Sequence, residues 1–261
     1  MSLLFGLGYV ALTLAALRGG LVGRDAMTVV GFDRRSLMMG VLAVGAAAWY
    51  LGPLYGLALV LAVAIHEFGH VAAYRVIGHH DARFRLVPLV AGYAISDRLP
   101  ARQVQSIFVS LLGPGISVAP MVLAYGLSDL MWGTNPLAAE FLWVFASVTA
   151  VMNLFNLLPF WPLDGGRCLR MIADTFLPSL AAYITLAMSA ACAALAVYTQ
   201  SFGLLFFTLI GMQSLLWADA VSRAQAPMTP GQGALATGAY LATAAAHLAG
   251  GWQILSSFLP F

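Results

Sequence analysis

Hydrophobic residues run in long, nearly uninterrupted stretches along this chain, and short polar clusters separate the stretches. Many of them approach the roughly 20 residues that a helix needs to cross a bilayer. The pattern predicts eight spans: 3–17, 37–52, 54–77, 101–125, 137–158, 178–198, 203–219 and 234–257. Three of these are short, so the expected fold is an all-α polytopic membrane helix bundle of about 6–8 spans.

Composition supports a membrane protein. Hydrophobic residues make up 61% of the chain and charged residues only 8%, against about 25% charged in soluble domains. The 261 residues suffice for a single integral membrane domain without a sizeable soluble module. A net charge of +2 gives no indication of nucleic acid as a partner. The two cysteines do not make a disulfide framework, and Cys168 is interpreted as a buried apolar thiol, although its position four residues after Asp164 leaves a metal role open.

The placement of arginine predicts the orientation of the bundle. All twelve basic residues are arginine. If the span 54–77 ends at the cytoplasmic face, every arginine lies in or next to a cytoplasmic segment, as the positive-inside rule requires. The N-terminal stretch has no leading positive charge, so it is expected to be a span rather than a cleaved signal peptide. The expected location is a bacterial inner (cell) membrane.

One polar motif interrupts the third apolar stretch, His66-Glu67-Phe68-Gly69-His70. Histidines at i and i+4 lie on the same helix face, so both imidazoles can reach one metal ion. Neutral imidazoles suit zinc, which takes three protein ligands in catalytic sites. Glu67 is placed to act as a general base. The expected helix end near Gly78 is about 12 Å from His70, which predicts a site in the cytoplasmic leaflet.

A second polar motif supplies the best candidate for the third ligand. Asp164 ends the segment Asn156-Leu-Leu-Pro-Phe-Trp-Pro-Leu-Asp164 and is followed by two glycines. The prolines and glycines break the helix, and irregular backbone at membrane depth is tolerated only where protein or a wet cavity surrounds it. The alternative is that Asp164 only caps a helix that begins at Gly165.

Together, the two motifs resemble the signatures of the site-2 protease family of intramembrane zinc metalloproteases, H-E-x-x-H and N-x-x-P-x-x-x-L-D-G. The resemblance covers about residues 54–170, the expected catalytic core. It implies one zinc ion per chain and gives five residues a role. These are the zinc ligands His66, His70 and Asp164, the catalytic base Glu67, and Asn156 as a contact to the substrate backbone or oxyanion.

The resemblance also has a gap on the family's middle helix. Gly113-Pro114 match a Gly-Pro-x-x-Asn pattern there, but Ser117 stands at the asparagine position, so the polar role is not carried over. Neither a PDZ nor a CBS regulatory domain is expected within this length.

Residues 83–95 are predicted to form a short re-entrant β-hairpin, because the segment partly alternates and contains Pro88 and Gly92. In the family a similar hairpin offers a strand edge to the substrate. Such an edge would hold a transmembrane substrate extended, with its carbonyls open to attack, and Gly92 is the expected contact. The alternative is an ordinary cytoplasmic loop.

These observations predict intramembrane peptide hydrolysis, with a single-pass membrane protein as substrate, the lipid bilayer around the bundle, and a membrane protein as regulatory partner. Two other functions stay open: a zinc transporter or sensor, and an inactive family member that acts as a chaperone. A transporter has no need of Glu67 beside the first histidine. Two other polar features are given no part in the zinc site. His79-His80-Asp81 is interpreted as a solvated cluster rather than a second metal site, and Asn153 as a bridge between helices.

Overall fold

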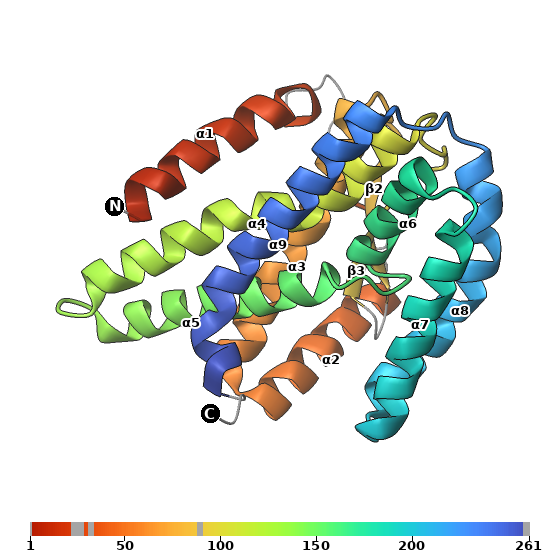
Figure 1. Cartoon of the computed structure of the whole chain (residues 1–261). Coiled ribbons are helices and arrows are strands. Elements are labelled where there is room, and N and C mark those ends of the chain that lie inside the picture. Colours follow the sequence, from red (N-terminus) through yellow and green to blue (C-terminus); the bar gives the residue numbers. More distant parts are fainter. Residues whose placement is uncertain (1, 22–28, 31–33, 88–90, 258–261) are drawn as a thin grey trace. The chain divides into compact units, whose positions relative to one another are not determined.

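The computed structural model describes residues 2–21, 29–30, 34–87 and 91–257, which form helices and a small sheet (Figure 1). The helices within these ranges are α1 (Ser2–Leu21), α2 (Arg34–Leu51), α3 (Pro53–Val76), α4 (Gln103–Met131), α5 (Pro136–Asn156), α6 (Asp164–Phe176), α7 (Ala181–Tyr198), α8 (Phe202–Arg223) and α9 (Pro230–Ser257). The strands are β1 (Val29–Val30), β2 (Arg83–Val87) and β3 (Ala91–Ile95).

Each of the eight apolar stretches falls on a helix, and α6 is an additional, shorter one. Within the described residues, α3, α4, α5 and α7 are long and apolar enough to cross a membrane. This supports a helical integral membrane protein, while the number of spans stays a prediction. Several aromatic side chains at helix ends are almost fully exposed, including Trp49 at 92% and Tyr198 at 87%, as expected where a bilayer rather than protein covers them.

Helix α3 has clear start and stop signals. Gly52, with φ of +93°, turns the chain out of α2, and Pro53 then occupies the first helical position, where a missing N–H costs nothing. At the other end Gly78 adopts φ of +92°. The backbone N–H of His79 donates to the carbonyl of Tyr74 at 2.9 Å, and that of Gly78 to Arg75 at 3.0 Å. This is a Schellman motif, and it ends the helix where the sequence predicts.

The described chain divides into two compact units. The first comprises Met1–Arg98, Leu112–Phe155 and Thr243–Phe261. Its core is built from α3, α4 and α5, with small residues that let the helix backbones approach closely. The core side chains are Ala58, Ala62, Val118, Met121, Ala124, Val144, Phe145, Ala146 and Ala150.

Polar contacts join α9 to the core of the first unit. The hydroxyl of Tyr125 donates to the carbonyl of Gly250 at 2.7 Å and lies 2.9 Å from the Ser147 hydroxyl. Nε2 of His247 donates to the carbonyl of Pro114 at 2.9 Å. These bonds satisfy polar groups that would be costly to leave unpaired away from water.

The second unit comprises Leu99–Leu111 and Asn156–Ala242. Helices α7 and α8 lie side by side in it (Figure 1). Two contacts hold the segment between α5 and α6. The Tyr240 hydroxyl donates to the carbonyl of Leu157 at 2.6 Å, and a Cβ on Gly211 would lie 2.6 Å from Pro162, so only glycine lets α8 approach so closely.

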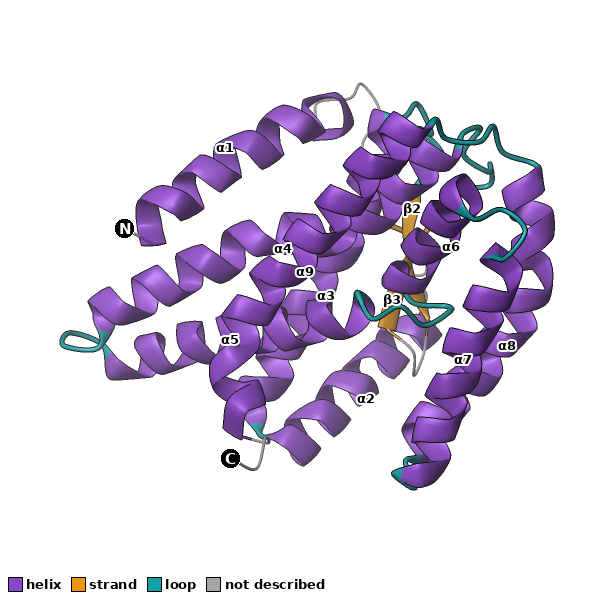
Figure 2. Ribbon diagram, viewed as in Figure 1, coloured by secondary structure: helices purple, strands orange, loops and turns teal. Residues whose placement is uncertain are grey.

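The small sheet belongs to the first unit (Figure 2), where β1 precedes α2 in the chain and β2 and β3 follow α3. Strands β2 and β3 pair antiparallel, with Phe84 opposite Ala94 and Leu86 opposite Gly92. Strand β1 pairs with β2 in parallel, so the order is β1-β2-β3 and β3 is the edge strand on its side. The pairing occupies the segment predicted to form a hairpin, and its entry into the membrane stays a prediction.

Candidate metal centre

The two motif histidines face each other on α3. Nε2 of His66 and Nε2 of His70 are 3.0 Å apart, and the rings meet edge to face at 87°. Both side chains are buried, at 4% and 8% exposure. Two nitrogens that each bind zinc at 2.0–2.1 Å in a tetrahedral site lie about 3.3 Å apart. The pair therefore presents its Nε2 atoms with a spacing close to that of a zinc site.

The position of the His70 ring depends on a glycine in α4. A Cβ added to Gly113 would lie 2.4 Å from both Cε1 and Nε2 of His70. One residue before His70, a Cβ on Gly69 would lie 2.4 Å from the carbonyl oxygen of Leu112. The two glycines let the backbones of α3 and α4 approach closely, so the backbone of α4 lies directly against the ring of His70.

His66 is held by Asn153 of α5. The two side chains make a buried hydrogen bond of 2.7 Å between His66 Nδ1 and Asn153 Oδ1. Sequence reasoning interpreted Asn153 as a bridge between helices and assigned it no part in the site. Only the distance between α3 and α5 could reveal that its partner is a motif histidine.

Asp164 is the first residue of α6, in the second unit, and it is 8% exposed. The N-cap position belongs to Leu163 and carries no side-chain cap hydrogen bond, so Asp164 does not occupy the capping position that the alternative interpretation gave it. A carboxylate in the first turn is favoured by the helix dipole. His66 and His70 in the first unit and Asp164 in the second are buried residues of types that bind metal ions.

The glycines after Asp164 allow the broken backbone before it to fold tightly. A Cβ on Gly165 would lie 2.1 Å from the carbonyl oxygen of Leu157, and one on Gly166 would lie 2.3 Å from that of Phe160. Any larger residue would push the loop away from the start of α6. The Gly-Gly pair thus fixes the position of the carboxylate in its own unit.

The remaining predicted site residues occupy defined places. Glu67 lies between the two histidines in sequence and is partly exposed, while Asn156 is the last residue of α5 and half-buried. Gly92 lies in β3, opposite Leu86. The roles of all three stay predictions.

The His79 cluster stabilises the base of the strand pair. Nδ1 of His79 and the Ser96 hydroxyl are 2.8 Å apart, and that hydroxyl donates to Asp81 at 2.9 Å. Asp97 accepts two hydrogen bonds from Arg83, at 2.7 and 2.9 Å. These contacts agree with the interpretation of a partly solvated polar cluster.

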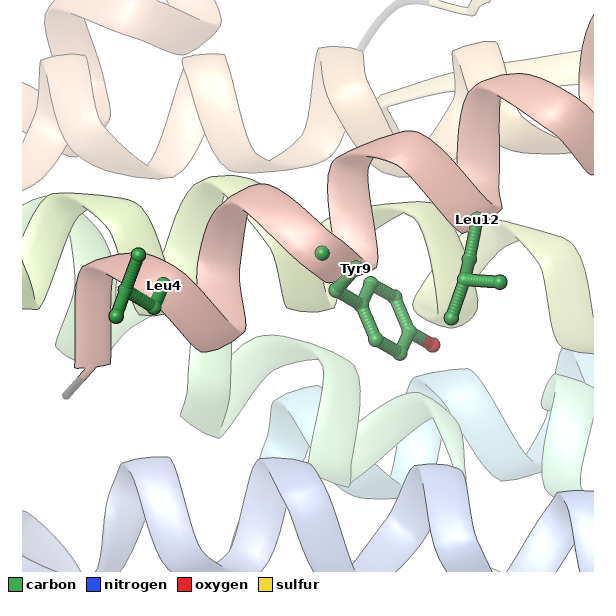
Figure 3. A pocket seen from close by; sticks show the side chains of 4 residues that line it. Leu4, Tyr9 and Leu12 are labelled. Atoms are coloured by element: carbon green, nitrogen blue, oxygen red, sulfur yellow. The ribbon is translucent and has the colours of Figure 1, made fainter.

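A shallow pocket on α1 has a different character. It is lined by Leu4, Gly8, Tyr9 and Leu12 (Figure 3). Its lining offers apolar surface and one phenol, with no histidine or carboxylate.

Comparison with known proteins finds zinc metalloproteases to which the chain is similar. No family model matches the chain. It is 27% identical over 114 residues to the zinc metalloprotease MJ0392 of Methanocaldococcus jannaschii, covering 44% of this chain and 32% of that protein. It is 30% identical over 132 residues to the inferred zinc metalloprotease sll0528 of Synechocystis, covering 49% and 33%. It is 28% identical over 170 residues to the inferred zinc metalloprotease YwhC of Bacillus subtilis, covering 53% and 76%.

The chain thus spans about a third of the length of the first two relatives. Among solved structures, a site-2 protease from Methanocaldococcus jannaschii aligns with a TM-score of 0.45 at 20% identity, over 72% of this chain and 87% of that one. The relatives' names and the donor set of two histidines and an aspartate support zinc as the metal. The names of these relatives and the paired motifs together support the resemblance to the site-2 protease family of zinc metalloproteases.

Proposed function

We propose that this protein is an intramembrane zinc metalloendopeptidase, which hydrolyses peptide bonds in or near transmembrane segments of membrane proteins. The observation that carries the proposal is the pair of Nε2 atoms of His66 and His70, 3.0 Å apart and buried on an apolar helix, with Glu67 beside them. Placing ionisable histidines inside an apolar membrane helix is unfavourable in free energy, and a functional role explains why they are present. Similarity to zinc metalloproteases favours hydrolysis over zinc transport or sensing.

In this proposal His66, His70 and Asp164 would hold one zinc ion. Zinc bound there would supply Lewis acidity and would lower the pKa of a water molecule to about 7. Glu67 accepts the proton of the attacking water and passes it to the leaving amine. Asn156 donates from its amide to the substrate backbone or to the developing oxyanion.

The edge strand β3 is the proposed binding place for the substrate. Since β1 covers the other side of β2, β3 offers its outer edge within the described sheet. An added strand from the substrate would make main-chain hydrogen bonds there, which keeps its scissile carbonyl out of helical hydrogen bonds. Gly92 has no side chain to obstruct that approach. The substrate class is a single-pass membrane protein, and the arginine distribution supports a site that faces the cytoplasm of a bacterial cell.

The test compares membrane-protein fragments in cells that carry the wild type or the Glu67→Gln variant. We expect new termini inside transmembrane segments with the wild type alone, because the amide cannot accept the proton. Removal of a general base costs about 10²–10⁴-fold in rate. Purified Glu67→Gln protein should keep its zinc, since the substituted side chain is not a ligand.

Two results would contradict the proposal. Near-normal cleavage by Glu67→Gln would remove the base assignment. Identical fragment profiles under several growth conditions, together with zinc flux through the purified protein in vesicles, would favour transport.

A further inference from the structure

Asn153 makes a hydrogen bond whose direction is fixed by its surroundings. The residue is fully buried in α5, with 0% exposure. Its Nδ2 donates to the carbonyl of Thr149, one turn earlier, at 2.8 Å. A backbone carbonyl can only accept, so the nitrogen of the amide must point toward Thr149. The amide oxygen is therefore the atom that faces His66.

This orientation determines the tautomer of His66. An amide oxygen accepts and does not donate, so Nδ1 of His66 carries the proton and donates across the 2.7 Å contact. A neutral imidazole with hydrogen on Nδ1 has its lone pair on Nε2. That lone pair faces Nε2 of His70, 3.0 Å away, and the two Nε2 atoms are the ones expected to bind the same metal ion.

We propose that Asn153 is a positioning residue, which holds His66 in the Nδ1–H tautomer and orients its Nε2 for zinc. The inference rests on the proposed zinc site and adds a residue outside both sequence motifs. Metal-binding histidines usually donate their second N–H to such a partner, which fixes the ring and raises its basicity. A residue that only bridged α3 and α5 would affect stability alone. A positioning residue also affects metal binding.

Matched variants separate these two roles. Asn153→Leu removes the acceptor with little change in volume, whereas Asn153→Asp keeps an acceptor at the same place. Ser147→Ala is the control, because it removes a part-buried hydrogen bond, 2.9 Å to Tyr125, at a buried position of the same helix without touching His66. Each purified protein is tested without substrate. Zinc affinity is measured against a competing chelator, the absorption spectrum is recorded with Co²⁺ in place of zinc, and thermal stability is followed in detergent.

We expect Asn153→Leu to lower zinc affinity by about 10–100-fold and to change the Co²⁺ spectrum. Asn153→Asp should retain affinity, and Ser147→Ala should change stability only. If Asn153→Leu does not fold, Asn153→Ala repeats the test. If neither folds, Asn153→Asp decides by itself: a carboxylate behind His66 should change the Co²⁺ spectrum, and an unchanged spectrum overturns the inference.

The outcomes separate this inference from the proposed function. Equal zinc affinity and an equal Co²⁺ spectrum for folded Asn153→Leu would overturn the inference while the protease proposal stands. A wild type that binds zinc but cleaves nothing would contradict the proposed function and leave the role of Asn153 intact. A wild type that binds no zinc would overturn both.

Discussion

The two motif segments of this protein are held in place by different means. The His66/His70 pair lies in the middle of a regular helix, and neighbouring helices fix it: Gly113 of α4 lies against one ring and Asn153 of α5 binds the other. Asp164 lies at the end of a broken segment in the second unit. There, backbone atoms of residues 157–161 lie against Gly165 and Gly166, and no regular element precedes the carboxylate.

The difference shows how each kind of ligand can be lost. A side chain on a helix keeps its orientation as long as the helix forms. Metal binding there is lost when a larger side chain on a neighbouring helix displaces the ligand. A residue after a broken segment depends on the tight turn itself and on whatever anchors the following helix. In the second unit, Arg170 provides that anchor, because it pairs with Asp174 of α6 at 3.2 Å and with Asp219 of α8 at 2.5 Å.

The largest effect is expected from removing the carboxylate. Losing the hydrogen-bond partner of a metal ligand typically lowers metal affinity by roughly 10–100-fold. Asp164→Ala should lower zinc affinity by more than this, because it removes a ligand itself. Zinc content of the purified protein, by metal analysis, is the measurement. Asp129→Ala, at an exposed position near the end of α4, is the control. Unchanged zinc content in Asp164→Ala would mean that the third ligand lies elsewhere.

The helix-held histidines should be sensitive to a single methyl group in α4. In Gly113→Ala the new Cβ would lie 2.4 Å from the His70 ring, whereas in Gly115→Ala the nearest atom, a Leu112 methyl, is 3.8 Å away. Overpacking costs about 1–3 kcal/mol, and the displaced ring should bind zinc at least several-fold more weakly. Gly115→Ala should be neutral or slightly stabilising, since alanine favours helix. Equal zinc affinities in the two variants would show that α4 does not position His70.

The anchor of α6 should contribute less. Arg170→Met removes the ion-pair partner of Asp174, which is 14% exposed and is then left, among the described residues, with only the Ser222 hydroxyl as a donor. The loss should cost about 1–3 kcal/mol in unfolding free energy. Asp219 is 43% exposed, so water compensates much of its loss. Arg223→Met is the matched control, because Arg223 is 84% exposed and 4.0 Å from Asp219. Similar thermal unfolding of the two variants would contradict an anchoring role for Arg170.

Sequence reasoning identified what is periodic or local. The apolar stretches located the helices, and Gly78 marked the end of α3 because a left-handed cap there needs glycine. It listed no span at α6, whose charged residues give no apolar run, and it considered a helix beginning at Gly165 only in the alternative in which Asp164 caps that helix. Asn153 was noticed for its position on α5, but its bond to His66 spans 87 residues. Such a contact depends on how α3 and α5 pack against each other. Periodicity and local motifs do not predict which side chains then meet.

The smallest effect is expected at the exposed end of the α3 region, where Asp81 stabilises the base of the strand pair. Desolvation acts to raise the pKa of Asp81, but hydrogen bonds from the Asp97 N–H and the Ser96 hydroxyl, with the charge of Arg98, outweigh it and lower the pKa below 3.8. A carboxyl with a lowered pKa stabilises the fold above its unfolded pKa, and this contribution is lost as the pH falls through the folded value.

Amide hydrogen exchange at Asp97, corrected for the intrinsic pH dependence, should therefore accelerate only below about pH 4 in the wild type. Asp81→Asn should show faster exchange already at neutral pH, while zinc affinity stays unchanged, because His66 and His70 are held by α4 and α5 and not by this cluster. If Asp81→Asn also weakened zinc binding, the Asp81 cluster and the His66/His70 pair would not be independent of each other. The strand pair would then be one of the elements that position the histidines.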